Sequence, residues 1–216
     1  MRKLDRTIAP SPACLGAYRH PANTWNDVES AERREIRASL ERMQGNRCAY
    51  CEGLVGADGH IEHFRRKGPG HYPELTFDWP NLFLSCGSSD HCGHYKDRPG
   101  APDYNPDEIV KPDIDDPDAE LYFHSTGEVR PRSDGNAPNA RRATETIRVL
   151  NLNCGRLRAQ RRRVVRIYEQ REPGILDALM EFDEPSRREF IDAEIEFTRN
   201  DPYWTVIRHY FEKINR

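Results

Sequence analysis

The sequence has no long hydrophobic run, because none of its segments approaches the roughly 20 consecutive apolar residues of a membrane-spanning helix. Its first residues, "MRKLDRTIAPSPACLG", lack the apolar core of a secretory signal peptide. A P-loop, an internal repeat and a helix-turn-helix pattern are also missing. We therefore expect a cytoplasmic protein with no membrane association, and any dependence on ATP would have to come from a partner.

Apolar residues are sparse as well. They make up 36% of the 216 residues, whereas charged residues make up 32%. This composition predicts an economical core beneath a well-solvated surface. Aromatic and aliphatic residues nevertheless recur in nearly every segment, which argues against disorder throughout. The length suits one compact unit with appendages.

The small net charge of -3 hides two opposed blocks. Residues 103–120 contain eight acids and one lysine, whereas residues 141–171 contain ten arginines and two acids. A basic block of this kind suits a polyanion such as nucleic acid, although a merely solvated face would look the same. The acidic block suits a solvated loop or a partner surface.

Local patterns predict an α+β fold, with a small motif domain between helical segments. After an extended arm, apolar residues at helical spacing predict a helix that Asp27 or Ser30 caps and Gly45 ends. A short strand-like piece should end near His63, and "NLFLSC" should be a short helical or buried segment. "AELYFHSTGEVRP" has the form of a hairpin with Gly127 in its turn, and the rest is helical in pattern. The expected parts are an N-terminal arm and helix (1–44), a motif domain (45–100), an acidic linker with a hairpin (101–135) and a helical C-terminal region (136–216).

Four of the six cysteines form two close pairs, Cys48-x2-Cys51 and Cys86-x5-Cys92. Disulfides are rare in a reducing compartment, so clustered cysteines there are better interpreted as metal ligands or packed thiols. Structural zinc prefers four tetrahedral Cys or His ligands from two short turns. The pairs therefore predict a structural zinc site, which a non-catalytic binding module could also contain.

Between the cysteine pairs lie residue types that phosphodiester hydrolysis needs. Glu62-His63 is followed 18 residues later by Asn81, just before the second cysteine pair. Imidazole can act as a general base near neutral pH, a divalent metal can stabilise charge at phosphate, and an amide can fix the orientation of the base. The alternatives are a packed histidine and an asparagine that caps a following helix.

Residues 48–97, "CAYCEGLVGADGHIEHFRRKGPGHYPELTFDWPNLFLSCGSSDHCGHYKD", resemble the HNH nucleases with a zinc-bound ββα-metal fold. The resemblance extends to the PtuB-like HNH subunit of Septu-type anti-phage systems, including retron-associated ones. It is based on "MQGNRCAYCE", "IEHFRRK", "SSDHCGHYKD" and "ETIRVLNLN" followed by an arginine-rich segment. The motifs outside 48–97 are far less specific.

The resemblance implies roles for individual residues. His63 would be the general base, Asn81 would orient it, and Glu62 would be a ligand of a catalytic magnesium ion. The third HNH residue is where this sequence departs from the common pattern, because the second pair is C-x5-C and Gly93 follows it. His94 is the first choice for that position and for the second magnesium ligand, and His91 is the second choice.

Basic residues near the expected base are candidates for phosphate contacts. Arg65, Arg66 and Lys67 follow His63 directly, and Lys96 occupies the place where the family often has a lysine. No element that would read bases is evident, so the sequence leaves DNA and RNA equally open as substrates.

The resemblance implies an endonuclease that is the toxic effector of a hetero-oligomeric defence complex. Its partners would be an ABC-type ATPase subunit and, in some systems, a reverse transcriptase with its RNA-DNA product. Two rival interpretations are a stand-alone HNH restriction or homing-type enzyme and a zinc-dependent adaptor that binds nucleic acid or protein. The first would be expected to carry its own sequence-reading module, and the second would need only the cysteines.

Overall fold

The computed structural model describes residues 1–132 and 137–212, and within them the fold is α+β. Eight α-helices accompany two separate two-stranded antiparallel sheets in this part of the chain. The helices are α1 (Ser30–Gln44), α2 (Cys92–Lys96), α3 (Pro117–Glu120), α4 (Ala137–Val149), α5 (Gly155–Arg171), α6 (Ile175–Glu181), α7 (Glu184–Phe197) and α8 (Trp204–Glu212). The strands are β1 (His60–His63), β2 (Leu82–Ser85), β3 (Leu121–Phe123) and β4 (Val129–Pro131).

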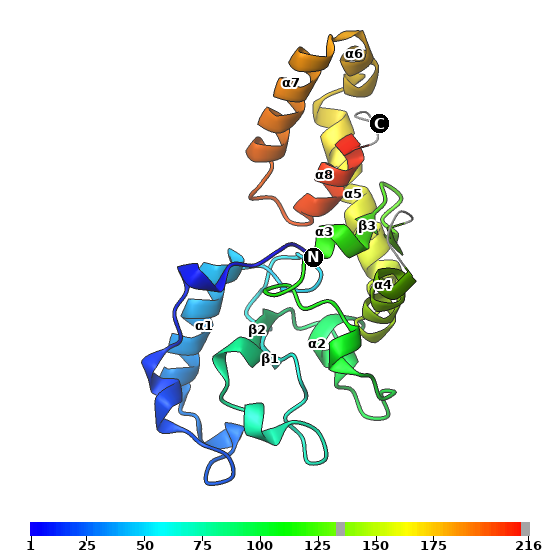
Figure 1. Cartoon of the computed structure of the whole chain (residues 1–216). Helices are drawn as coiled ribbons and strands as arrows, with labels where there is room; N and C mark the ends of the chain where they lie inside the picture. Colours follow the sequence, from blue (N-terminus) through cyan, green and yellow to red (C-terminus); the bar gives the residue numbers. More distant parts are fainter. Residues whose placement is uncertain (133–136, 213–216) are drawn as a thin grey trace.

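The elements form an elongated molecule (Figure 1). Helix α1, the β1–β2 sheet and α2 lie at one end, and α6 and α7 lie at the other. Helix α5 runs between the two ends, and α8 packs along it. None of the helices in the described ranges is long and apolar enough to cross a membrane.

Helix α1 follows the pattern that the sequence predicts. Ile36, Leu40 and Met43 are buried on one face, and Gly45 ends the helix in the left-handed conformation with φ 59°. The expected cap differs, because Glu29 is the N-cap residue and forms a reciprocal capping box with Glu32.

Strands β1 and β2 pair from His60 opposite Ser85 to His63 opposite Leu82. The segment predicted as helical or buried is thus buried, but it is a strand. The side chain of Gln44, at the end of α1, makes strand-like hydrogen bonds with Leu84. Its Nε2 donates to the Leu84 carbonyl at 2.9 Å, and its Oε1 accepts from the Leu84 amide at 2.8 Å. One polar side chain therefore satisfies backbone groups on the open side of β2.

The predicted hairpin is present as β3 and β4. Gly127 lies in its turn with φ 84°, a backbone conformation that glycine adopts without strain. A Cβ atom at this position would lie 2.0 Å from the carbonyl oxygen of Arg158, so the turn also touches the backbone of α5. The hairpin joins the helical region, since α4 packs on β4 and α8 on β3.

The N-terminal arm is packed against the body of the protein. Met1, Leu4, Ala9 and Leu15 are buried. The guanidinium of Arg6 donates to the carbonyl of Leu82 in β2 at 2.9 Å. The arm was expected to be extended, but it contains three short 3-10 turns, and its apolar side chains belong to the core.

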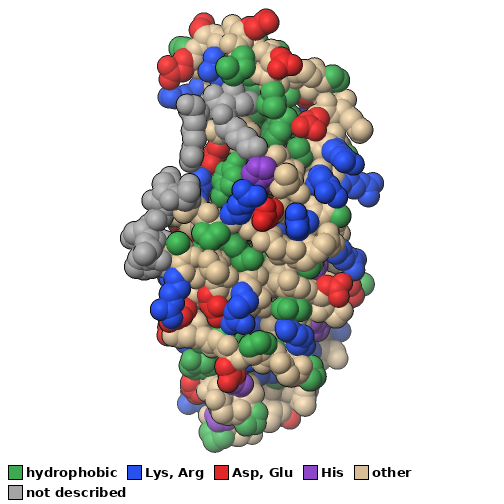
Figure 2. All heavy atoms as spheres, turned by 90° about the vertical axis from the view of Figure 1, so that its right-hand side faces the viewer, with side chains coloured by type: hydrophobic (Ala, Val, Ile, Leu, Met, Phe, Trp, Pro, Cys, Tyr) green, Lys and Arg blue, Asp and Glu red, His purple; other side chains and the backbone are tan. Residues whose placement is uncertain are grey.

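The acidic and basic blocks neutralise each other in part. Arg142 pairs with Asp115 at 2.6 Å and with Glu120 at 3.0 Å, and Arg141 pairs with Glu108 at 2.9 Å. Part of the acidic segment therefore pairs with α4, while Asp103, Asp107 and Asp116 are exposed, as a solvated loop would be. Figure 2 shows basic side chains on this side of the molecule interspersed with acidic and apolar ones.

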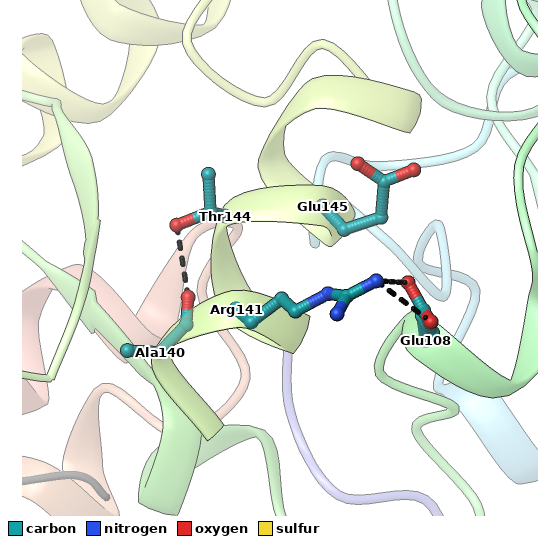
Figure 3. A pocket seen from close by; sticks show the side chains of 5 residues that line it. All are labelled: Glu108, Ala140, Arg141, Thr144 and Glu145. Carbon is teal, nitrogen blue, oxygen red and sulfur yellow. Dashed lines mark hydrogen bonds and ion pairs between the residues drawn. The ribbon is translucent and has the colours of Figure 1, made fainter. Parts of the chain in front are cut away.

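A hollow of about 490 Å³ lies at this junction (Figure 3). Its lining residues are Glu108, Ala140, Arg141, Thr144 and Glu145. Arg141 reaches across to both carboxylate oxygens of Glu108, at 3.0 and 2.9 Å. None of the expected site residues lines this hollow, and the Arg141–Glu108 pair beside it joins the acidic segment to α4.

Candidate functional site

The two cysteine pairs come together in space. Cys48 and Cys51 lie in the turn after α1, Cys86 follows β2, and Cys92 begins α2. Their four sulfur atoms all lie within 4.8 Å of one another. Four sulfurs at about 2.3 Å from a tetrahedral ion would be separated by about 3.8 Å, so this donor set fits a metal ion after a small contraction.

Local backbone geometry aims the cysteines inward. The Cys48 amide donates to the Gly53 carbonyl at 2.9 Å, and the Glu52 amide donates to the Cys48 carbonyl at 3.1 Å, which closes the first turn. Cys92 has the left-handed value φ 61°, unusual for a residue with a side chain. Its amide donates to the Leu150 carbonyl at 2.9 Å, so the end of α4 helps to hold the second turn.

His91 lies with the cysteines. Its Nδ1 is 3.1 Å from the Cys92 sulfur and 3.6 Å from the Cys86 sulfur, and the side chain is buried. The structure therefore directs His91 toward the cysteine cluster. His94 lies elsewhere, on the opposite side of Cys92 in sequence and next to His60.

His63 ends β1 and is only 2% exposed. Its Nε2 is 3.0 Å from the carbonyl oxygen of Thr76. A carbonyl can only accept, so this bond places the proton on Nε2 and leaves the lone pair on Nδ1. The edge of the Trp25 ring packs on the imidazole, with centroids 4.7 Å apart and planes at 89°. Burial, together with nearby Lys67, lowers the pKa of His63 to about 4, so the ring is neutral at pH 7.

Asn81 acts on the loop that carries Thr76. Its Oδ1 accepts from the Arg65 amide at 2.7 Å, and its Nδ2 donates to the carbonyls of Arg65 at 3.1 Å and Leu75 at 3.0 Å. The expected direct hydrogen bond to His63 is not among the contacts of the described residues. Asn81 instead joins the two ends of the loop 65–75, next to the carbonyl that orients His63. It ends a 3-10 turn before β2 and does not cap a helix.

Glu62 is buried and ionised. Its Oε1 pairs with the Lys96 ammonium at 2.8 Å, and its Oε2 lies 3.1 Å from Nε2 of His60. Burial raises the pKa of this carboxyl, but Lys96 and His60 outweigh that effect and lower the pKa to about 2. Neighbouring strand residues point to opposite faces, so Glu62 and His63 leave β1 on different sides.

His60 is not among the residues that the sequence singles out, but it lies in the candidate site. Its ring stacks on that of His94, with centroids 3.8 Å apart and planes at 21°. It therefore links His94 to Glu62, and its Nδ1 is buried without a hydrogen-bond partner in the part of the chain that the structure describes. The sequence could have indicated this position, because His60 and Glu62 are two residues apart on one strand and therefore share a face.

Gly93 fits closely beneath this group. A Cβ atom there would lie 2.3 Å from Oε2 of Glu62 and 2.9 Å from Nε2 of His60. The backbone at the start of α2 therefore forms one wall of the site that holds Glu62, His60 and His94.

Three of the four expected phosphate contacts are engaged within the protein. Arg65 pairs with Asp107, and Arg66 pairs with Asp97 at 3.0 Å. The Lys96 side chain is 0% exposed and binds the His63 carbonyl at 3.0 Å as well as Glu62. Lys96 therefore does not contact nucleic acid as expected, because its ammonium points inward. Burial lowers the pKa of Lys96, but the nearby carboxylate of Glu62 raises this pKa above its usual value.

Lys67 is exposed and lines a hollow of about 410 Å³. The hollow lies between the N-terminal arm and the loop after β1, and it includes Trp25 and Thr76, the two neighbours of His63. Lys67 is therefore the expected phosphate contact that is exposed to solvent at this hollow.

We predict that the His63 imidazole titrates near pH 4 in an NMR pH titration. Replacing Trp25 with alanine should move this pKa upward toward 6.5, because water would then reach the ring. The Trp25→Phe variant keeps an aromatic cover and should stay near the value of the unaltered protein. An unshifted pKa in Trp25→Ala would show that Trp25 does not control solvation of the base.

We predict that Asn81→Ala lowers the free energy of unfolding by about 1–3 kcal/mol, because three partly buried backbone groups lose their partner. Urea unfolding would measure the loss, and amide exchange in residues 65–76 should accelerate. Asn200→Ala, at an exposed position, is the matched control. Equal stability of the two variants would contradict the proposed joining of the loop ends.

Comparison with known proteins identifies relatives of the chain. The Septu protein PtuB of Bacillus mycoides (strain KBAB4) is 27% identical over 70% of this chain and 58% of its own length. The retron Ec83 putative HNH endonuclease of Escherichia coli is 25% identical over 76% of this chain and 79% of its own length. A Septu protein PtuB of Bacillus thuringiensis is 33% identical over 38% of this chain and 30% of its own length.

The matched region thus spans less than two thirds of either Septu protein but more than two thirds of the retron protein. No protein-family model matches the chain. Two of these relatives are named PtuB, and the third is named a putative HNH endonuclease. The chain is therefore related to the PtuB proteins of Septu systems and to a putative HNH endonuclease of a retron system.

Proposed function

We propose that the chain is a metal-dependent HNH endonuclease that hydrolyses phosphodiester bonds in nucleic acid. The observation that carries this proposal is the state of His63: a neutral imidazole whose Nε2 is tied to a carbonyl and whose Nδ1 is left as the proton acceptor. The names of the relatives support the same activity.

The reaction requires a proton acceptor beside an attacking water. Nδ1 of His63 would take a proton from water as the water oxygen bonds to phosphorus. The bond from phosphorus to the leaving oxygen then breaks, and that oxygen gains a proton from solvent. Thr76 fixes the tautomer of His63, and Asn81 fixes the loop that carries Thr76. Trp25 limits access of bulk water to the ring.

We further propose two separate metal roles. Zinc on Cys48, Cys51, Cys86 and Cys92 would be structural, because four sulfur ligands leave no position open for substrate. Magnesium or another divalent ion held by Glu62 and His94 would supply positive charge beside the scissile phosphate. Carboxylate oxygens are preferred ligands of such ions. The ammonium of Lys96 pairs with Oε1 of Glu62 and would compete with the ion for that oxygen.

We assign β1, β2 and α2 to the ββα-metal core of the HNH nucleases. We also keep the division of the chain into the four parts predicted from the sequence. The support is the element order, two antiparallel strands followed by a helix, with the expected base at the end of the first strand. Since Glu62 and His63 lie on different faces of β1, this assignment requires the phosphate to lie at the strand end, within reach of both.

The context we propose is anti-phage defence. The relatives are named as Septu and retron proteins. The chain would be the nuclease effector of a cytoplasmic complex with an ABC-type ATPase subunit, and in a retron system with a reverse transcriptase and its RNA-DNA product. Lys67, beside the hollow next to His63, is the first candidate for a phosphate contact, followed by Arg65 and Arg66.

The activity is tested by incubating the protein, alone and with its genomic neighbours, with DNA, total RNA and magnesium. His63→Ala should lower the cleavage rate by about 10²- to 10⁴-fold, the usual contribution of a general base. His71→Ala, an exposed histidine of the same loop region, should cleave at the original rate. Absence of cleavage in every combination, or equal cleavage by both variants, would leave a zinc-binding adaptor as the better interpretation.

Gly93→Ala should abolish most cleavage while zinc remains bound. The new methyl group would occupy the space of Oε2 of Glu62, so the carboxylate must turn away from the proposed magnesium site. Gly16→Ala is the control, since nothing lies within 4 Å of its Cβ position. Full activity of Gly93→Ala at low magnesium concentration would contradict the proposed role of Glu62.

A further inference from the structure

Arg161, in the middle of α5, is buried with 0% exposure. Its Nη1 donates to the carbonyls of Leu152 at 2.7 Å and Gly127 at 3.2 Å. Nε and Nη2 are buried and have no hydrogen-bond partner among the described residues. No ion pair between Arg161 and a carboxylate exists within residues 1–132 and 137–212.

A buried guanidinium without a counter-charge is costly, because burial removes the water that stabilises the charge. The ring of Phe123, 5.2 Å away, and the two carbonyls compensate it in part. Burial lowers the pKa of Arg161, and the sulfurs of Cys51 and Cys92 are the largest influences in the opposite direction. Glu52 acts in the same direction, but its carboxylate is already paired with the Met1 ammonium and with Arg2. The cysteines are therefore the negative groups left to balance this cation.

Backbone hydrogen bonds and a shared hollow connect α5 to the cysteine cluster. The short segment after α4 bridges the two, since Leu150 accepts from the Cys92 amide at 2.9 Å and Leu152 accepts from Arg161. Cys51 and Cys86 also line one hollow of about 410 Å³ together with Gln160, the residue before Arg161.

The first cysteine turn is joined to α8 as well. Glu52, one residue after Cys51, accepts from the Thr205 amide at 3.1 Å and from the Thr205 hydroxyl at 2.5 Å. Both cysteine turns therefore contact the C-terminal helical region, one through Glu52 and the other through Cys92.

A divalent ion bound by four thiolates leaves an excess of negative charge, because two positive charges meet four negative ones. We propose that Arg161 is the counter-cation of the four-cysteine zinc site, so that zinc binding and the docking of α5 and α8 are one coupled equilibrium. This inference rests on the zinc site of the proposed function and not on nuclease activity. Arg161 is a positioning residue, since it acts on the metal through the thiolates.

The first test measures zinc affinity of the full chain by competition with a chromogenic chelator under reducing conditions. Arg161→Met keeps the bulk but removes the charge, and should weaken zinc binding by about 10- to 100-fold, as removal of groups around metal ligands commonly does. Arg161→Lys restores a charge and should recover most of the affinity. Arg162→Met, at an exposed position of the same helix, should bind as the original protein does.

Unchanged affinity in Arg161→Met would overturn the inference, and so would equal losses in Arg161→Met and Arg161→Lys, because packing and not charge would then explain them. Since the neutral variant could fail to fold, a second measurement uses the unaltered chain. Hydrogen exchange should accelerate in α5 and α8 when a chelator removes zinc and slow again when zinc returns. Equal exchange rates in α5 and α8 with and without zinc would overturn the coupling. Zinc affinity and hydrogen exchange do not depend on cleavage, so both outcomes stand even if the protein cleaves no nucleic acid.

Discussion

The convergence of four cysteines is the constraint on which the rest of the structure depends. The β1–β2 sheet has two strands of four residues each, too little to be stable alone. The cysteines join the end of α1, the end of β2 and the start of α2 around one point. The sequence neighbours of these cysteines then hold the C-terminal helices. A bound metal would thereby join segments whose own strand pairing is too short to be stable.

Within this frame, burial acts in opposite ways on two adjacent residues. Glu62 remains an anion because Lys96 offers a buried positive charge, whereas His63 remains neutral because its own surroundings are dry and contain Lys67. The proposed hydrolysis of phosphodiesters would need both states at the same pH, one to attract a cation and one to accept a proton. One strand provides them by directing the two side chains into different environments.

Spacing along the chain predicted the cysteine cluster and the hairpin around Gly127, and the structure contains both. The roles of Glu62 and His63 remain proposals. His60 was missed because a histidine carries no signal by itself, although its two-residue offset from Glu62 on a strand placed both on one face. The inward turn of Lys96 was not predictable, since lysine is almost never buried without a partner and that partner is 34 positions away in the sequence. The pairing of the acidic and basic blocks likewise depends on tertiary contacts that no local pattern encodes.

The Asn81 side chain has a consequence for how such a protein can diversify. It binds the backbone at Arg65 and at Leu75, so the loop between them is closed at its base by one amide. A longer or different tip would leave this closure, and with it the position of the imidazole, unchanged. The tip of this loop is thus a place where segments of other sequence or length could be inserted while His63 and its neighbours keep their positions.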